Sequence, residues 1–217
     1  VCSLKYFKYI FLAIILTSLV QAFIWTKGGD KVVIPPTIGD KLESVSYTPF
    51  KGFDKALKSD AEVATDMQTI AKIAKKVRTY AMDDAKKVLT NLGDAKLKVD
   101  VGLWLSTDKG ANEAEIEALF DVIKFYHPKI ASIIVGNEVL LRADLTSEEL
   151  IAYIDRVSKR TRIPVTTAEV QHVWLTNKEL PKHVDFINVH ILPYWEITVG
   201  DFFREYLPDG FLDKKIS

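Results

Sequence analysis

Residues 130–142 read IASIIVGNEVLLR, an aliphatic run that is interrupted by the polar pair Asn137-Glu138. The stretch from Ile130 to Val135 has the composition of a strand that is buried on both faces of a parallel sheet. Directly after it stands Glu138, whose charge is costly to bury unless it is paired or protonated. Glu138 therefore lies either at the mouth of a site that uses its proton or in a buried ion pair.

Strand-like segments of this kind alternate with helical patterns along the chain. Strands are predicted over residues 44–47, 76–80, 98–105, 130–135, 163–168 and 186–190. Helices are predicted after three capping boxes, Ser59-x-x-Glu62, Asn112-x-x-Glu115 and Thr146-x-x-Glu149, and also from Asp83 or Asp84 to Gly93. This alternation predicts an α/β fold with a parallel sheet covered by helices.

Two architectures fit the alternation, a doubly wound sheet and a (β/α)8 barrel. No Gly-x-Gly-x-x-Gly segment follows the first strand, and the chain has no Walker-type loop. A doubly wound sheet that binds nucleotides therefore lacks its best signature.

The N-terminal segment differs from the rest of the chain. An uncharged apolar run from Tyr9 to Trp25 follows Lys5 and Lys8, which is typical of a signal peptide or of a membrane anchor. We expect residues 1–25 to be a signal peptide or signal-anchor helix that contacts the membrane through residues 4–25. The following domain is then exported, either membrane-anchored or secreted (periplasmic). Residues 26–43, with paired glycines and paired prolines, are predicted to be a linker, which leaves 44–217 as the domain.

The charge balance argues against nucleic acid as a partner. Without Lys5 and Lys8, the chain carries 27 basic and 29 acidic residues, with both signs mixed along the sequence. Nucleic-acid binding needs a basic patch or stripe, and none is evident. The only cysteine, Cys2, precedes the apolar run, so the exported part has no disulfide and depends on its own core.

Polar and aromatic residues gather at the ends of the predicted strands. Because chemistry in a parallel barrel is found at the carboxyl ends of the strands, these residues are candidates for one site. They are Tyr47, Arg78, Tyr80, Trp104, Asn137, Glu138, Glu169, His190, Tyr194 and Trp195. Carboxylate, amide and imidazole groups suit sugar hydroxyls, and aromatic rings pack on the C–H face of a sugar. The combination predicts a carbohydrate cleft.

Structural explanations exist for several of these residues. Trp104 and Tyr80 could be core aromatics, and His190 could be a core histidine with satisfied hydrogen bonds. Arg78 could pair with Glu169 or with Glu138. His172 and His190 could bind a metal beside Glu169, but no His-x-His pair marks an early strand, and we predict no metal site. Gly-x-Ser-x-Gly and His-Glu-x-x-His motifs are also missing.

Six segments together resemble glycoside hydrolase family 17, and most closely its bacterial β-glucan-active members. They are VSYTPF (45–50), VRTYA (77–81), VDVGLWL (99–105), IIVGNEVLLR (133–142), VTTAEV (165–170) and FINVHILPYWE (186–196). The resemblance implies a (β/α)8 barrel and a retaining reaction on β-1,3-linked glucan. It also implies that Glu138 is the general acid/base, preceded by the matching Asn137, and that the other strand-end residues line the sugar cleft. No cofactor is implied, because carboxylates suffice for this reaction.

The resemblance explains the position of Glu138 and also shows what is missing. A partly apolar pocket at a strand end would disfavour the charged form, so on this resemblance we expect the acid to keep a proton for the leaving glycosidic oxygen. Family members carry their nucleophile in a Gly-Glu-x-Gly-Trp-Pro-like stretch on strand seven, and this chain ends before such a motif. We therefore expect about six of the eight strands, a nucleophile beyond Ser217, and an inactive fragment of an active glycosidase. Alternatives are a non-catalytic glucan-binding relic, or a fragment of a larger membrane glucan-synthesising protein.

Overall fold

The computed structural model describes residues 4–28, 41–52 and 56–192. The chain divides into two units, Val1–Asp40 and Lys41–Ser217. The described part of the first unit is helix α1 (Leu4–Gly28), which includes residues 26–28 of the predicted linker. Among the residues described, no helix combines the length and the apolar character that crossing a membrane requires. The signal peptide or anchor stays a prediction.

The second unit is built on a sheet of six parallel strands. These are β1 (Leu42–Ser46), β4 (Ala74–Arg78), β5 (Lys98–Leu103), β6 (Ile130–Asn137), β7 (Val165–Val170) and β8 (Asn188–His190). Their order in the sheet is β1-β4-β5-β6-β7-β8, and every pair is parallel. Each new strand is thus added on the same side of the previous one, whereas a doubly wound sheet reverses direction at a switch point. The sheet is an incomplete barrel of the (β/α) type, as predicted.

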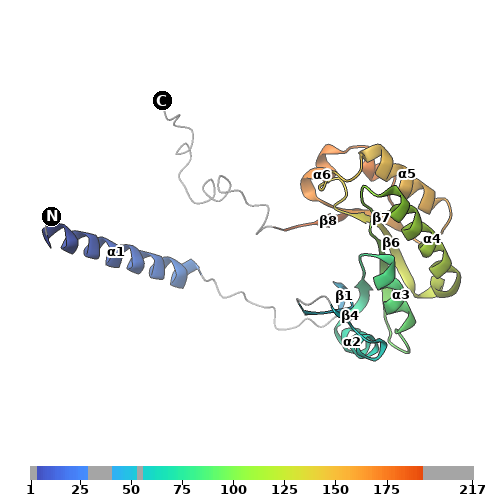
Figure 1. Cartoon of the computed structure of the whole chain (residues 1–217), viewed down its shortest axis with the longest axis horizontal. Coiled ribbons are helices and arrows are strands. Elements are labelled where there is room, and N and C mark those ends of the chain that lie inside the picture. Colours follow the sequence, from blue (N-terminus) through green and yellow to red (C-terminus); the bar gives the residue numbers. More distant parts are fainter. Residues whose placement is uncertain (1–3, 29–40, 53–55, 193–217) are drawn as a thin grey trace. The chain divides into compact units, whose positions relative to one another are not determined.

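Helices cover the outer face of this curled sheet (Figure 1). They are α2 (Asp60–Ile73), α3 (Met82–Thr90), α4 (Lys109–Tyr126), α5 (Ser147–Ser158) and α6 (Gln171–Thr176), with 3₁₀ turns at His127–Lys129 and Leu180–Lys182. A short antiparallel hairpin, β2 (Phe50–Lys51) with β3 (Ala56–Leu57), lies between β1 and α2 in the chain. Strand β1 begins at Leu42, two residues before the predicted start of the domain.

Two of the three predicted capping boxes are present. Ser59 and Glu62 cap α2, and Thr146 and Glu149 cap α5, with both reciprocal hydrogen bonds in each case. The third prediction was wrong, because the N-cap of α4 is Asp108, whose carboxylate accepts the N–H groups of Gly110 and Ala111. Asn112 is instead a buried residue inside α4.

The hydrophobic core lies between the sheet and the helices. One face of each of the strands β4, β5, β6 and β7 packs on it, and Val77, Val99 and Val101 on β4 and β5 are completely buried. Met67 on α2 and Ile154 on α5 belong to the same cluster. The core therefore occupies the outer layer of the barrel, whereas the inner face of the sheet carries a mixture of polar and apolar side chains.

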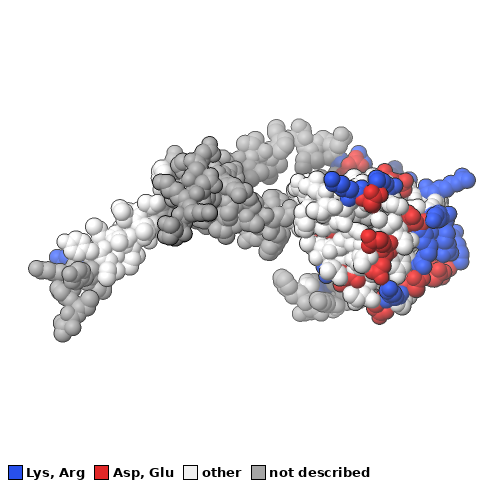
Figure 2. Space-filling view, turned by 90° about the horizontal axis from the view of Figure 1, so that it is seen from above, with Lys and Arg blue, Asp and Glu red and all other residues white. Residues whose placement is uncertain are grey.

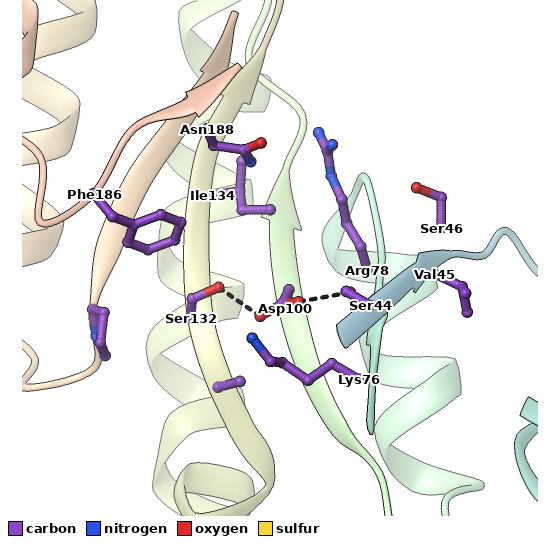
Figure 3. Close-up of a pocket in the computed structure, with 12 residues that line it drawn as sticks. Ser44, Val45, Ser46, Lys76, Arg78, Asp100, Ser132, Ile134, Phe186 and Asn188 are labelled. Carbon is purple, nitrogen blue, oxygen red and sulfur yellow. Dashed lines mark hydrogen bonds between the residues drawn. The ribbon is translucent and has the colours of Figure 1, made fainter. Parts of the chain in front are cut away.

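A hollow of about 520 Å³ opens on that inner face. Figure 3 shows Asp100 between Ser44 and Ser132, from strands on either side of it. Its two carboxylate oxygens accept the hydroxyl groups of Ser44 at 2.8 Å and Ser132 at 2.7 Å. Both acceptor atoms of a nearly buried charge are thereby satisfied, which limits the cost of its burial. Arg78 lines the same hollow and extends from it toward the carboxyl ends of the strands.

Candidate active site

The turn after β6 holds Glu138 in an uncommon backbone conformation. Gly136 has a φ of +85° and Glu138 a φ of 54°, so the chain turns sharply between the strand and the following loop. A Cβ on Gly136 would lie 2.5 Å from Cγ2 of Val139, which is too close for any side chain. The glycine of the Gly-Asn-Glu segment is therefore required by Val139, which folds back over the strand end.

Main-chain hydrogen bonds fix Glu138 on both sides. Its N–H donates to the carbonyl oxygen of Ala168 on β7 at 2.7 Å, and its own carbonyl accepts the N–H of Arg142 at 2.9 Å. A non-glycine residue with positive φ is uncommon and is maintained only when the surroundings determine it. Glu138 is therefore held at the carboxyl end of the sheet by its neighbours.

The carboxylate of Glu138 meets the imidazole of His190. Oε1 of Glu138 lies 2.6 Å from Nδ1 of His190, which is the last residue of β8. The two side chains are 25% and 16% exposed, so the pair is partly shielded but still open to a ligand. The structure thus brings together two predicted site residues that are 52 positions apart in the sequence.

Arg78, at the end of β4, completes this group of polar side chains. One of its terminal nitrogens lies 3.2 Å from Nε2 of His190, and the other donates to Oδ1 of Asn137 at 2.7 Å. Because the guanidinium has only donors, Nε2 of His190 must accept, which assigns the proton to Nδ1. His190 then donates to Glu138. Arg78 therefore bonds to His190 and Asn137, and it does not form the ion pair with Glu169 that was considered as a structural explanation.

A cleft of about 590 Å³ lies beside Glu138. Its wall includes Leu141, Leu175 and Leu192, together with Gln171 and His172. This wall is largely apolar, and Glu138 contributes the one carboxylate among these lining residues. The acid therefore faces an accessible space and not only its hydrogen-bonding partners.

Aromatic rings lie at the ends of the neighbouring strands. Trp104, directly after β5, is 42% exposed, which excludes an ordinary core role. Its backbone N–H donates to Oε2 of Glu115 on α4 at 2.9 Å, and burial raises the pKa of that carboxyl. Tyr80 lies under the guanidinium of Arg78, with its ring centroid 4.9 Å away.

Glu169 lies differently from the prediction. In β7 it precedes Val170, which pairs with His190, so the alternation of a strand turns Glu169 to the opposite face of the sheet. It is completely buried, and its carboxylate accepts the N–H groups of Leu140 at 2.8 Å and Leu141 at 3.4 Å. Burial raises its pKa. Glu169 supports the loop that carries Glu138 and does not reach the cleft.

Tyr47 is also turned away from the predicted site. Its hydroxyl donates to Oδ2 of Asp66 on α2 at 2.8 Å, and burial raises the pKa of the phenol well above its usual range. Tyr194 and Trp195, the other two predicted residues, lie outside the described part of the chain. In that described part, no three His, Cys, Asp or Glu side chains are grouped as a metal site would require.

Comparison with known proteins identifies the family. A family model described as the BtgE/BtgC glycoside hydrolase domain matches residues 44–206, about three quarters of the chain. The chain belongs to the BtgE/BtgC glycoside hydrolase family. Arg78, Asn137, Glu138 and His190 all lie within the matched residues.

Solved structures share the fold of this chain. The glycoside hydrolase family 17 β-1,3-glucanosyltransferase from Rhizomucor miehei superposes with a TM-score of 0.64 at 23% identity, over 74% of this chain and 61% of that one. An endo-laminarinase from Formosa superposes with a TM-score of 0.59 at 19% identity, over 70% of this chain and 50% of that one. The predicted membership of family 17 is confirmed.

The curated relatives are longer than this BtgE/BtgC chain. The glucan endo-1,3-beta-glucosidase btgC of Emericella nidulans is 27% identical over 171 residues, 70% of this chain and 26% of the relative. The glucan 1,3-beta-glucosidase BGL2 of Candida albicans is 25% identical over 190 residues, 74% of this chain and 60% of the relative. Both are fungal, and the predicted bacterial affiliation stays a prediction.

Arg142 is the site residue that the sequence did not single out. It stacks on Trp104 and bonds to the turn of Glu138, although it lies inside the quoted segment 133–142. The available signal was its position as a charged residue directly after the aliphatic run Val139–Leu141 that follows Glu138. Elsewhere on this BtgE/BtgC domain, Figure 2 shows basic and acidic side chains close together on the surface in view, as expected for solvated faces.

Proposed function

We propose that this chain is the part of a retaining β-1,3-glucanase or β-1,3-glucanosyltransferase that carries the proton donor, Glu138. The observation that carries the proposal is the 2.6 Å contact between Glu138 and His190 at the rim of a cleft, with Arg78 and Asn137 adjoining. The fold neighbours include an active-site mutant of the Rhizomucor miehei enzyme in complex with laminaritriose, at 23% identity and a TM-score of 0.63 over 71% of this chain and 59% of that one. That kinship suggests β-1,3-glucan as the substrate class.

The hydrogen bonds define how Glu138 would use its two oxygens. His190 donates Nδ1–H to Oε1, so Oε1 is occupied whether or not the carboxyl group is protonated. The acidic proton then sits on Oε2. In the first step Oε2–H protonates the leaving glycosidic oxygen, and in the second step the carboxylate accepts a proton from water or from a sugar hydroxyl.

Asn137 and Trp104 would bind the sugar. Arg78 holds Oδ1 of Asn137, so the orientation of the amide is set and its nitrogen can donate to a sugar hydroxyl. The exposed indole of Trp104 offers a flat apolar surface for the C–H face of a glucose unit. The retaining reaction also needs a carboxylate nucleophile about 5 Å from the acid, and we assign no residue of this chain to that role.

The decisive experiment compares Glu138→Gln with native protein in the complete encoded protein. We expect turnover of β-1,3-gluco-oligosaccharides to fall by about 100- to 10,000-fold, the usual contribution of a general acid. An aryl glucoside with an activated leaving group needs no protonation, so the first step should be much less affected. Glu148→Gln on the exposed first turn of α5 is the control. Equal losses on both substrates, or no loss, would contradict the assignment.

A non-catalytic glucan-binding role is the second candidate. The large exposed fraction of Trp104 favours it, because a binding module needs such a platform and does not need an acid. In this case Glu138→Gln and the native protein bind β-1,3-gluco-oligosaccharides equally in calorimetry, and neither turns them over.

A further inference from the structure

Arg142 joins three separate segments around the proposed site. Its guanidinium donates to the carbonyl oxygen of Asn137 at the end of β6 and to that of Leu105 after β5, the latter at 2.9 Å. Its Nε donates to Oδ2 of Asp144 at 2.8 Å. A planar group with five N–H donors can serve all three acceptors at once, which the ammonium of lysine on its flexible stem cannot do in the same geometry.

The same guanidinium also covers one face of Trp104. Its central carbon lies 4.6 Å from the centroid of the indole ring. Stacking of this kind is favourable, because the ring face is electron-rich and the guanidinium is flat. A sugar can then stack only on the other face of Trp104. Arg142 therefore determines which face of the indole is accessible to a ligand.

Arg142 holds the backbone of Glu138 from two directions. Its side chain bonds to the carbonyl of Asn137, before Glu138, and its backbone N–H donates to the carbonyl of Glu138 itself. Both carbonyl groups that flank the Cα of Glu138 are thus fixed by one residue. This residue has a positive φ, a conformation that its surroundings must maintain.

We propose that Arg142 is a positioning residue that couples the sugar platform Trp104 to the proton donor Glu138. A glucan stacked on Trp104 is thereby presented to the acid at a fixed distance. The proposal rests on the proposed function and narrows its substrate class, since full activity requires a β-1,3-glucan long enough to contact Trp104 and Glu138 together. A single glucoside gains nothing from the coupling.

The first test needs no enzymatic activity. Hydrogen exchange is measured on the chain of residues 1–217 as wild type, Arg142→Lys and Arg160→Lys. Arg160 is the matched control, because it also stacks on an aromatic ring, Phe120, and pairs with a carboxylate, Glu117, but does so on the helical layer. We expect Arg142→Lys alone to raise the exchange of the amides of Glu138 and Arg142. Unchanged exchange at these two amides overturns the proposal.

The second test uses the complete encoded protein and separates KM from kcat. Arg142→Lys should raise KM for long oligosaccharides and lower kcat, because a misplacement of about 1 Å costs about 100-fold. For an activated aryl glucoside, which does not reach Trp104, KM should stay unchanged. Trp104→Ala should raise KM alone.

The double variant decides whether the two residues act together. If Arg142 acts through Trp104, Arg142→Lys combined with Trp104→Ala raises KM no further than Trp104→Ala does alone. Additive effects on KM overturn the coupling. Native protein that turns over no β-1,3-glucan contradicts the proposed function and the sugar part of this inference, whereas the exchange result alone decides whether Arg142 supports Glu138.

Discussion

Replacement of Gly136 by alanine tests how the turn of Glu138 is built. Two separate costs are expected at this position. The φ of +85° is unfavourable for a residue with a Cβ, and a left-handed conformation costs about 1–2 kcal/mol. The new methyl group would also lie 2.5 Å from Cγ2 of Val139, which is completely buried and cannot retreat into solvent.

The steric cost adds to the backbone cost. Overpacking of a buried site typically costs about 1–3 kcal/mol, so Gly136→Ala should lower the free energy of unfolding by about 2–5 kcal/mol in total. Gly93→Ala is the matched control, because Gly93 has a φ of +50° and a Cβ there would meet nothing within 4 Å. Only the backbone cost applies to it.

Urea unfolding of the 1–217 chain, followed by circular dichroism, measures both variants. The double variant Gly136→Ala/Val139→Ala removes the clashing methyl and should relieve the steric part, although it adds a cavity cost of its own. A Gly136→Ala variant that is no more destabilised than Gly93→Ala would refute the steric clash with Val139. In that case the glycine of the Gly-Asn-Glu segment is not required by the packing of Val139.

Three further variants test other parts of the structure. Thr146→Ala removes the cap of α5 and should cost about 1 kcal/mol of unfolding free energy in urea; a neutral result would mean that the capping box contributes nothing. Glu169→Gln probes the raised pKa of Glu169. The folded chain holds that proton more tightly, so wild-type stability relative to the variant should fall as the pH rises from the ordinary value of 4.5 through the raised one, and then level off. If the thermal unfolding temperature of the wild type, relative to that of the variant, instead rose with pH over this range, this expectation would be contradicted. Trp174→Phe removes the 3.1 Å hydrogen bond from the indole to the carbonyl of Asn188 and should cost about 1–3 kcal/mol; unchanged hydrogen exchange in β8 would show that the bond does not hold this strand.

The order of the six parallel strands could be predicted because each of them has a strong local pattern, whereas the short β2–β3 hairpin and helix α6 were not predicted. The run Ile130–Val135 predicts β6, and the boxes at Ser59 and Thr146 place the starts of α2 and α5. The capping box predicted at Asn112 does not form, because the carboxylate of Asp108, four residues earlier, accepts the N–H groups at the start of the helix. Asn112 is then free to bond both main-chain groups of Ser106 from inside the helix. Two competing caps cannot be ranked from sequence alone.

A predicted site residue lies near Glu138 when its side chain meets two conditions: it stands at a strand end, and it points to the inner face of the sheet. Arg78 and His190 fulfil both conditions and meet near Glu138. Glu169 fulfils only the first, because the register of β7 with β8 turns it to the outer face. The role of Arg142 depends on a loop that returns over Trp104, and no periodic pattern specifies the path of a loop.

The left-handed backbone of Glu138 has a consequence for the evolution and engineering of this protein. Glycine at 138 would adopt the φ of 54° without penalty, so the stability of the turn and the proton-donor role proposed for Glu138 favour different residues. Screens that select variants only for thermal resistance should therefore recover substitutions at this position that yield a sturdier but inert molecule. Under the proposed role, glutamate is retained at 138 only where selection also requires turnover.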